Sequence, residues 1–390
     1  PVAGESKLMS VKITRREFAL TTSAIPLSSR RAAAAGRPVL LFIGAYTSEK
    51  NKGIATVRFD LATGELSDMK LAAETPNPTF LELHPSGKYL YAVNEISNYE
   101  GQRAGSVCAY SIQRSTGALT LLNRLTTQGP GPCHIGLDRT GRMAMIANYG
   151  GGSVASYAIE SNGSLRGPVS FVQHEGSGPN AKRQDRPHAH SFNAAPGNKF
   201  AVACDLGTDE IRVYAIDPKT GAIKPHGAAK AAPGSGPRHF AFHPNGRYGY
   251  AVNELSSTVT VYTWDAKAGA LGDVQTISTL PEGFQGQTTA AEIRVHPSGR
   301  FLYASNRGHD SIAVFSVDAN SGRLSAVEQV SVQGRTPRNF HLEPEGRWLI
   351  VANQQTDNII VFEIDAATGR LRTTGKGIVV GAPVCLRTLG

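Results

Sequence analysis

Apolar and polar residues alternate along most of the chain after residue 38, in short runs separated by Gly, Pro, Asn and Asp. Examples of such runs are STVTVYTWD (257–265), SIAVFSVD (311–318) and NIIVFEID (358–365). A period of two residues is typical of half-buried β-strands, whereas no window after residue 38 sustains the 3.6-residue period of a helix. The pattern therefore predicts an all-β protein.

A longer unit repeats from residue 78 onward, with a spacing of about 46–55 residues. Each copy holds an apolar run, a turn such as HPSG, a second run that ends near an Asn, a third alternating run, a turn such as ATGRL and a fourth run. The first two runs of successive copies span 77–95, 131–150, 186–205 (a divergent copy), 236–254, 290–308 and 336–354. We interpret each unit as a four-stranded antiparallel meander, the form of a propeller blade.

The two ends of the repeat array predict how the ring closes. The N-terminal copy starts at PVLLFIGAY (38–46), which matches a second strand, so this copy lacks its first strand. A surplus strand, APVCLRTL (382–389), stands alone at the C-terminus and resembles a first strand. Residues 37–390 are thus predicted to form a seven-bladed β-propeller that is closed by the C-terminal strand joining the N-terminal blade, which removes exposed sheet edges.

Composition narrows the possible partners. The formal charge is +9, of which +4 falls in the first 36 residues, and the remaining +5 is spread without any Lys/Arg run. Nucleic-acid binding normally shows as a basic stripe, so we expect no nucleic-acid partner and instead a mildly positive pocket for a small anionic metabolite. No run approaches the ~20 apolar residues of a spanning helix, so no membrane insertion is expected. The four cysteines lack metal-site spacing and are predicted to be buried thiols.

Residues 1–36 have the order of a secretory signal. TRREFAL (14–20) pairs two arginines ahead of a weakly apolar stretch, and RRAAAAG (30–36) supplies small residues for cleavage. The twin arginines suggest the Tat route, which would place the protein in the periplasm or outside the cell. The alternative is a disordered basic tail on a cytoplasmic protein.

Candidate chemistry is predicted on one face of the propeller. The starts of first strands and the ends of second strands lie on the same face, around the channel, so loops there are the expected place for function. An Asn recurs after the second strand in five of six copies, which indicates a structural role. Four residues break the pattern in adjacent blades four to six, and we predict that they converge as a catalytic group: His190, Arg238, Glu254 and Arg307.

The residue types of this group suit acid–base chemistry on an anion. Two arginines can hold a carboxylate, a phosphate or a developing oxyanion, while His190 and Glu254 can move a proton. His188, Asn253 and Arg338 are predicted as further substrate contacts. Aligning the copies on their turn glycines places His190 in the same slot as His134 and His239, with His188 at the rim.

A metal site is the alternative interpretation of the PHAH segment (187–190). His188 and His190 are two residues apart, and His134, His174 or His239 would have to supply a third ligand. No third ligand stands at a fixed spacing from this pair, so we expect neither a metal nor another cofactor.

Several segments together resemble a known family. PHAH, the unit GPRHFAFHPNGRYGYAVNEL (236–255), HPSGRFLYASNRG (296–308) and the C-terminal PVCL (383–386) are similar to the seven-bladed lactonase family, which includes propeller-type 6-phosphogluconolactonases and fungal carboxymuconate cyclases. The resemblance implies an active site of one His, two Arg and one Glu, which fall on His190, Arg238, Glu254 and Arg307.

The resemblance also implies an activity. We expect a metal-independent lactonase, similar to 6-phosphogluconolactonase, that hydrolyses a sugar lactone such as 6-phosphogluconolactone or gluconolactone by general acid–base chemistry. Two alternatives stay open: a cycloisomerase of the carboxymuconate cyclase type, and a non-catalytic propeller of the cell envelope.

Overall fold

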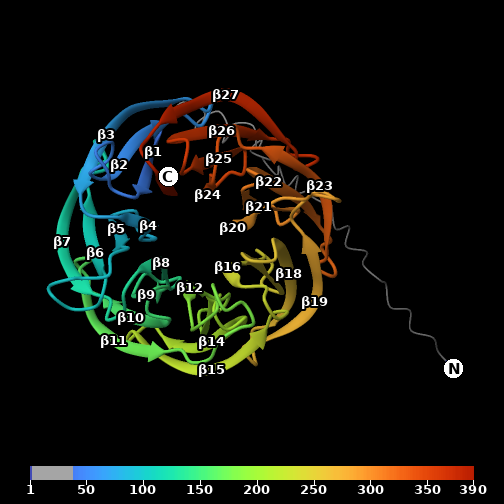
Figure 1. Cartoon of the computed structure of the whole chain (residues 1–390), viewed down its shortest axis with the longest axis horizontal. Helices are drawn as coiled ribbons and strands as arrows, with labels where there is room; N and C mark the ends of the chain where they lie inside the picture. Colours follow the sequence, from blue (N-terminus) through green and yellow to red (C-terminus); the bar gives the residue numbers. More distant parts are fainter. Residues whose placement is uncertain (2–37) are drawn as a thin grey trace.

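The computed structural model describes Pro1 and residues 38–390. Residues 38–390 form 28 strands arranged as seven separate four-stranded antiparallel sheets around a central axis (Figure 1). The predicted secretion signal, apart from Pro1, lies outside the described residues. In the described part of the chain, no helix is long and apolar enough to cross a bilayer.

The seven blades follow one another along the chain. Blades 2 to 7 each run from their inner to their outer strand, whereas the inner strand of blade 1 comes from the C-terminus. Blade 1 holds β28 (Pro383–Leu389), β1 (Val39–Ala45), β2 (Gly53–Phe59) and β3 (Leu66–Glu74), and blade 2 holds β4 (Pro78–Leu83), β5 (Tyr89–Asn94), β6 (Ser106–Ile112) and β7 (Leu119–Thr126). Blade 3 holds β8 (Pro132–Leu137), β9 (Met143–Asn148), β10 (Ser153–Ile159) and β11 (Leu165–Gln173), and blade 4 holds β12 (Ala189–Ala194), β13 (Phe200–Asp205), β14 (Glu210–Asp217) and β15 (Ala222–Lys230).

The remaining three blades have the same order. Blade 5 holds β16 (Pro237–Phe242), β17 (Tyr248–Asn253), β18 (Thr258–Asp265) and β19 (Ala270–Ser278). Blade 6 holds β20 (Thr289–Val295), β21 (Phe301–Arg307), β22 (Ser311–Val317) and β23 (Leu324–Ser331), and blade 7 holds β24 (Pro337–Leu342), β25 (Trp348–Asn353), β26 (Asn358–Ile364) and β27 (Leu371–Val379). The predicted fold is confirmed.

The apolar core lies between the blades. The second strand of each blade is almost wholly buried, because both of its faces pack against neighbouring blades. The third strands hold more half-buried positions, as in β14 and β26. The fourth strand carries polar residues toward solvent, as in β3 and β27. Burial on two faces explains why the second strands contain continuous apolar runs, such as that of β25.

Ring closure depends on β28. This C-terminal strand pairs antiparallel with β1, from Leu40 opposite Leu389 to Ala45 opposite Pro383. It also bonds to both neighbouring blades, since Leu386 N donates to Asn339 Oδ1 at 3.0 Å and Arg387 Nε lies 3.2 Å from Glu82 Oε2. The two ends of the chain are therefore locked into one blade without a disulfide, and the four cysteines are free and buried.

The recurrent Asn is structural, as predicted. Asn94, Asn148, Asn253, Asn306 and Asn353 are all fully buried at the ends of their second strands. The side-chain amide of Asn148 donates to Thr127 O and to Ser153 Oγ, and that of Asn306 donates to Thr279 O and Ser311 Oγ. Asn148 and Asn306 thus tie their strand ends to the preceding connection and to the third strand. Asn253 bonds to the third strand and Asn353 to the preceding connection.

Candidate active site

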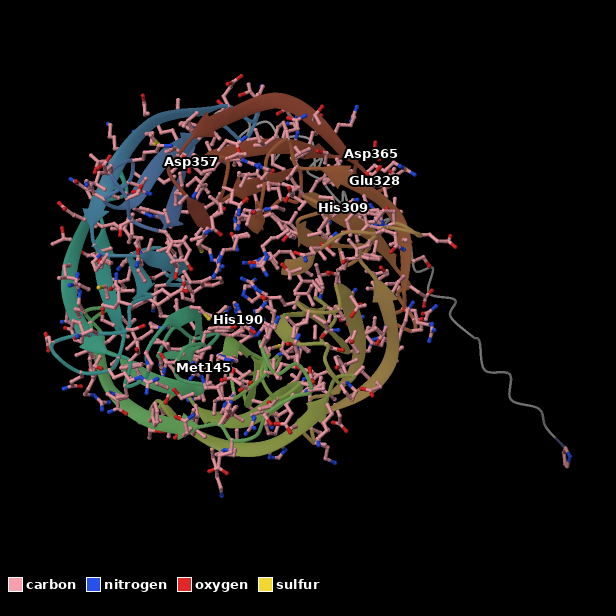
Figure 2. The ribbon with its side chains drawn as sticks, in the orientation of Figure 1. Met145, His190, His309, Glu328, Asp357 and Asp365 are labelled. Atoms are coloured by element: carbon pink, nitrogen blue, oxygen red, sulfur yellow. The ribbon has the colours of Figure 1, made fainter. Side chains whose placement is uncertain are left out.

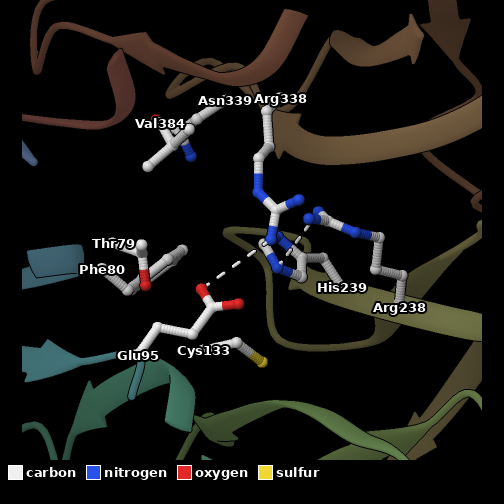
Figure 3. Close-up of a pocket in the computed structure, with 9 residues that line it drawn as sticks. All are labelled: Thr79, Phe80, Glu95, Cys133, Arg238, His239, Arg338, Asn339 and Val384. Carbon is white, nitrogen blue, oxygen red and sulfur yellow. Dashed lines mark hydrogen bonds and ion pairs between the residues drawn. The ribbon is translucent and has the colours of Figure 1, made fainter. Parts of the chain in front are cut away.

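A β-bulge in six of the seven first strands points one side chain toward the channel. In six blades the pairing between the first and second strands skips one residue of the first strand, where two residues oppose one. The skipped residues are Thr79, Cys133, His190, Arg238, Arg338 and Val384. Five of these six line one depression at the centre of the ring (Figure 3).

The bulges show that the predicted equivalents of His190 in the other blades were wrong. Its equivalents are Cys133 and Arg238, not His134 and His239, which follow the bulge by one position. The error arises at the turn of blade 4. There the left-handed position that a turn Gly occupies elsewhere is taken by Asn198 (φ 58°), and Gly197 precedes it, so an alignment on glycines is displaced by one residue. His190 itself lies at the edge of the central opening (Figure 2).

The four predicted catalytic residues converge, and Glu254 is their centre. Its Oε2 lies 3.0 Å from Arg238 Nε, 2.9 Å from Arg307 Nη2 and 3.9 Å from His190 Nε2. Glu254 follows β17, Arg238 begins β16, and Arg307 ends β21, so adjacent blades supply the cluster. Arg238 and Glu254 are 2% and 4% exposed, which makes this a buried ion-pair network.

Burial and charge act against each other at the acidic residue. Burial alone would raise the pKa of Glu254, but the positive charges of Arg307, Arg238 and Arg183 outweigh it and lower the pKa to about 2. Burial, with the charge of Arg307 next, lowers the pKa of Arg238 to about 10. At neutral pH, Glu254 is therefore a carboxylate and Arg238 a cation.

His190 is neutral at the same pH. Burial lowers its pKa well below the usual value, and the charge of Arg238 lowers it further. The Nδ1 atom lies 3.6 Å from Cys133 Sγ, whereas Nε2 is directed toward Glu254. Burial raises the pKa of Cys133, so this neighbour is a thiol. An uncharged imidazole beside a fixed carboxylate can accept a proton and have its new charge stabilised.

The three residues predicted as further substrate contacts take different positions. His188 is buried at the rim, where its ring stacks on Tyr149 at 4.5 Å and its Nδ1 lies 3.0 Å from Tyr149 O. Arg338 lines the central depression across from the Glu254 network. Asn253 is not brought into the group, because its amide donates to Thr258 and Thr260 inside its own blade.

The five histidines considered as metal ligands do not make up a metal-ligand set. The rings of His134 and His190 pack against that of His239, with centroids 5.4 and 5.3 Å away. His188 and His190 have different polar neighbours, Tyr149 O and Cys133 Sγ, although both rings contact Tyr149. His174 is engaged with Asp205 and Tyr214 inside blade 4. Within residues 38–390, no three His, Cys, Asp or Glu side chains gather as potential metal ligands. The donor set of the site instead consists of three guanidinium groups, one carboxylate and one imidazole.

Arg183 is a site residue that the sequence did not reveal. Its Nη2 lies 2.5 Å from Glu254 Oε1 and donates to Tyr149 OH at 3.3 Å. It comes from the connection 174–188, which has no counterpart in the other repeats and is pinned by the buried Gln184, whose amide donates to Leu206 O and Asp209 Oδ1. At 37% exposure, Arg183 is the most accessible of the three arginines around Glu254.

Known proteins resemble the whole propeller. A family model described as "Lactonase, 7-bladed beta-propeller" matches residues 40–388. A Bacillus subtilis protein named 6-phosphogluconolactonase is 39% identical over 299 residues, which cover 77% of this chain and 83% of that protein. A Formosa agariphila protein of the same name is 34% identical over 307 residues, which cover 77% of this chain and 85% of that protein.

A solved structure also resembles the chain over most of its length. The periplasmic gluconolactonase of Pseudomonas aeruginosa superposes with a TM-score of 0.85 at 34% identity, covering 90% of this chain and 99% of that one. The repeats, the closure and these similarities agree, and the chain belongs to the lactonase family of seven-bladed β-propellers.

Proposed function

We propose that this protein hydrolyses a sugar lactone to the corresponding acid, without a metal, at the site formed by His190, Arg238, Glu254 and Arg307. The observation that carries the proposal is a neutral, buried imidazole beside a carboxylate that three arginines keep ionised. Relatives named 6-phosphogluconolactonase and gluconolactonase support the choice of a lactone as substrate.

In the proposed mechanism, His190 is the general base. It takes a proton from a water molecule whose oxygen attacks the lactone carbonyl carbon. The carbonyl oxygen then becomes an oxyanion, which Arg307 and Arg238 stabilise. When the bond between the carbonyl carbon and the ring oxygen breaks, protonated His190 returns its proton to the ring oxygen. The product carboxylic acid loses its proton to solvent.

Glu254 stays ionised throughout this sequence. Its carboxylate holds the guanidinium groups in place and stabilises the imidazolium that forms on His190, as the acid of a catalytic triad does. Arg307 has a donor left over for the oxyanion, because its buried Nε has no hydrogen-bond partner in the structure. We assign the base role to His190 because Glu254, with a pKa of about 2, is too weak a base.

A lactone panel tests the proposal. The full chain should release acid from glucono-1,5-lactone and its 6-phosphate faster than buffer does, and equally fast after treatment with a chelator. Arg238→Lys keeps the charge but loses the forked donors, so kcat should fall by about 100-fold. Absence of turnover on every lactone, or wild-type rates in Arg238→Lys, would contradict the proposal. Loss of the diene absorbance of a muconate would instead assign a cycloisomerase.

A further inference from the structure

A second polar group faces the same depression and has no part in the mechanism above. It consists of Tyr46, Thr79, Glu95 and Arg338, from blades 1, 2 and 7, and we call it the distal group. Its members occupy the same slots as the catalytic residues: Thr79 and Arg338 are bulge residues, and Tyr46 and Glu95 follow second strands. Glu95, Thr79 and Arg338 line the central depression together with Arg238 and Cys133 (Figure 3).

The distal group is held in a fixed arrangement. Tyr46 OH donates to Glu95 Oε1 at 2.9 Å, and burial raises the pKa of Tyr46, so this hydroxyl keeps its proton. The guanidinium of Arg338 lies over the Tyr46 ring, 5.5 Å from its centroid. Asn77 joins the two loops beneath, since its Oδ1 accepts from Thr47 N at 3.0 Å and its N–H group Nδ2 donates to Glu95 O at 3.3 Å.

Two oxygens of this group are buried without a hydrogen-bond partner: Glu95 Oε2 and Thr79 Oγ1. The nearest cation to Glu95 Oε2 is Arg338 Nη2 at 3.9 Å, which is too far for a hydrogen bond. Leaving such atoms unsatisfied costs free energy, so they are best explained by a ligand that completes them. A carboxylate oxygen such as Glu95 Oε2 needs a hydrogen-bond donor. An alcohol hydroxyl can donate to it and can also form a hydrogen bond with Thr79 Oγ1.

The charges of the distal group favour a neutral ligand. Arg338 is its single cation, and Glu95 places a carboxylate beside it. Arg238, on the other wall, is paired with Glu254 and is assigned to the lactone carbonyl in the proposed mechanism. A phosphoryl group carries close to two negative charges at neutral pH and is normally bound by several cationic donors, which this wall lacks.

We propose that the distal group binds the hydroxyl-bearing end of an unphosphorylated aldonolactone, with a substrate hydroxyl donating to Glu95 Oε2. This inference rests on the lactonase function proposed above and extends it to substrate class. It makes Glu95 a specificity-determining residue, while the lactone carbonyl is bound at Arg238 and Arg307.

Kinetics on three lactones provide the test. Wild type should favour glucono-1,5-lactone over its 6-phosphate in kcat/KM. In Glu95→Gln, KM for glucono-1,5-lactone should rise about 10-fold through loss of a hydrogen bond to a charged group, and the gap to the phosphate ester should narrow. The parameters for δ-valerolactone, which has the same ring without hydroxyls, should not change. Tyr46→Phe removes the hydroxyl that holds the Glu95 carboxylate in place, so it should also raise KM for glucono-1,5-lactone. The exposed Glu49→Gln is the matched control.

Binding without turnover separates this inference from the proposed function. Calorimetry should find D-gluconate bound more tightly than hexanoate, an acid of equal length without hydroxyls, and Glu95→Gln should remove that difference. Equal binding of the two acids, an unchanged ratio in Glu95→Gln, or equal losses on all three lactones would overturn the distal assignment even if lactones are hydrolysed. Absence of any lactone turnover, with hydroxyl-dependent gluconate binding intact, would overturn only the proposed chemistry.

Discussion

Glu254 is the residue on which the charges of the site converge. It has ion-pair contacts with Arg183, Arg238 and Arg307 while being almost wholly buried. A buried carboxylate is tolerable only with such compensation, and the arginines in turn need the carboxylate. Burial keeps His190 neutral by lowering its pKa, and Arg238 of the same network lowers it further. Stability and protonation at this site are therefore coupled.

Neutralising Glu254 should damage stability as well as activity. Glu254→Gln leaves Arg238 and Arg307 buried without their counter-charge, and the free energy of unfolding should fall by about 3 kcal/mol. Denaturant titration measures this change. The control is Glu363→Gln, which removes a half-exposed partner of Arg347 and should cost less than about 1 kcal/mol. Equal effects of the two substitutions would mean that the buried network carries no special cost.

The pH dependence of the rate should report His190. Because the pKa of His190 is lowered, the imidazole stays unprotonated through pH 6.5, and kcat/KM should not fall until the solution is well below that pH. Initial rates on glucono-1,5-lactone, corrected for spontaneous hydrolysis at each pH, measure the profile. His190→Gln should lower kcat by about 100-fold or more across the whole range. An acid limb centred at pH 6.5 or above would contradict the base role of a desolvated His190.

At the scale of elements, the first-strand bulge is the device that builds the site. In six of the seven blades, one extra residue leaves the pairing and points toward the channel, so the propeller supplies a ring of positions whose side chains can vary without disturbing the sheets. The loops after the second strands supply a second ring, anchored by the recurrent Asn. Blade 4 differs, because Asp205 replaces that Asn.

Asp205 anchors the loop around the histidines of blade 4. Its Oδ1 accepts from His188 N at 2.8 Å and Gly207 N at 2.9 Å, and its Oδ2 lies 2.5 Å from His174 Nδ1. Asp205→Ala should reduce the free energy of unfolding by about 3 kcal/mol or more, since several buried donors lose their acceptor. It should also lower kcat by displacing His190, which follows His188 by two residues.

An exposed aspartate provides the comparison for Asp205. Asp365 accepts from Ala367 N and Thr368 N in a surface turn, where water can replace the lost acceptor. Asp365→Ala should therefore destabilise the protein less than Asp205→Ala and leave kcat unchanged. Denaturation and lactone kinetics on the two variants separate a buried anchor from an ordinary turn, and identical losses would contradict the special role of Asp205.

At the scale of the whole molecule, ring closure determines whether the blades fold together. β28 provides the inner strand of blade 1 and bonds to blades 2 and 7. Deleting residues 383–390 opens the ring and exposes the edge of β1, so we expect loss of the cooperative thermal transition and aggregation of the protein. Deleting Gly390 alone is the control and should leave the transition in place. A cooperative transition in the 383–390 deletion would show that closure is dispensable.

Stability should fall in acid because the channel buries neutral histidines. Burial lowers the pKa of His134, His190, His239 and His341, with His239 at about 4. The unfolded chain takes up protons below pH 6.5 that the folded chain refuses, so the free energy of unfolding should drop between pH 6.5 and about 4. His239 alone accounts for about 3 kcal/mol. Stability that is flat from pH 7 to 4.5 in denaturant titrations would contradict this expectation.

The family resemblance and the architecture were predictable because both depend on repeated units of the sequence. The alternation of apolar and polar residues predicted the strands, and the spacing of the repeats predicted the blades. The incomplete first copy and the surplus C-terminal strand predicted the ring closure. His190, Arg238, Glu254 and Arg307 were identifiable because they differ from their counterparts in other copies at positions that all copies share. This comparison works where a repeat supplies a reference position.

Residues without such a reference were missed or misplaced. Arg183 lies in the connection 174–188, which has no counterpart in other blades. Tyr46 lies in the N-terminal copy, which lacks a first strand and was not among the six copies whose strand ends were compared, so it was not matched with Glu95. The slot of His190 was displaced because the turn of blade 4 puts Asn198 where the other turns have Gly.

The sequence by itself determined the seven blades, their closure and the face on which the chemistry gathers, because these follow from local periodicity and from the order of the repeats. Only the tertiary structure decided which side chains meet. Contacts across the channel join residues far apart in sequence, such as Arg183 with Glu254 and Tyr46 with Arg338, and one-residue bulges decide which side chain each strand points inward. The protonation states of Glu254 and His190 depend on these tertiary contacts, since the burial and the neighbouring charges that shift their pKa values exist only in the closed ring.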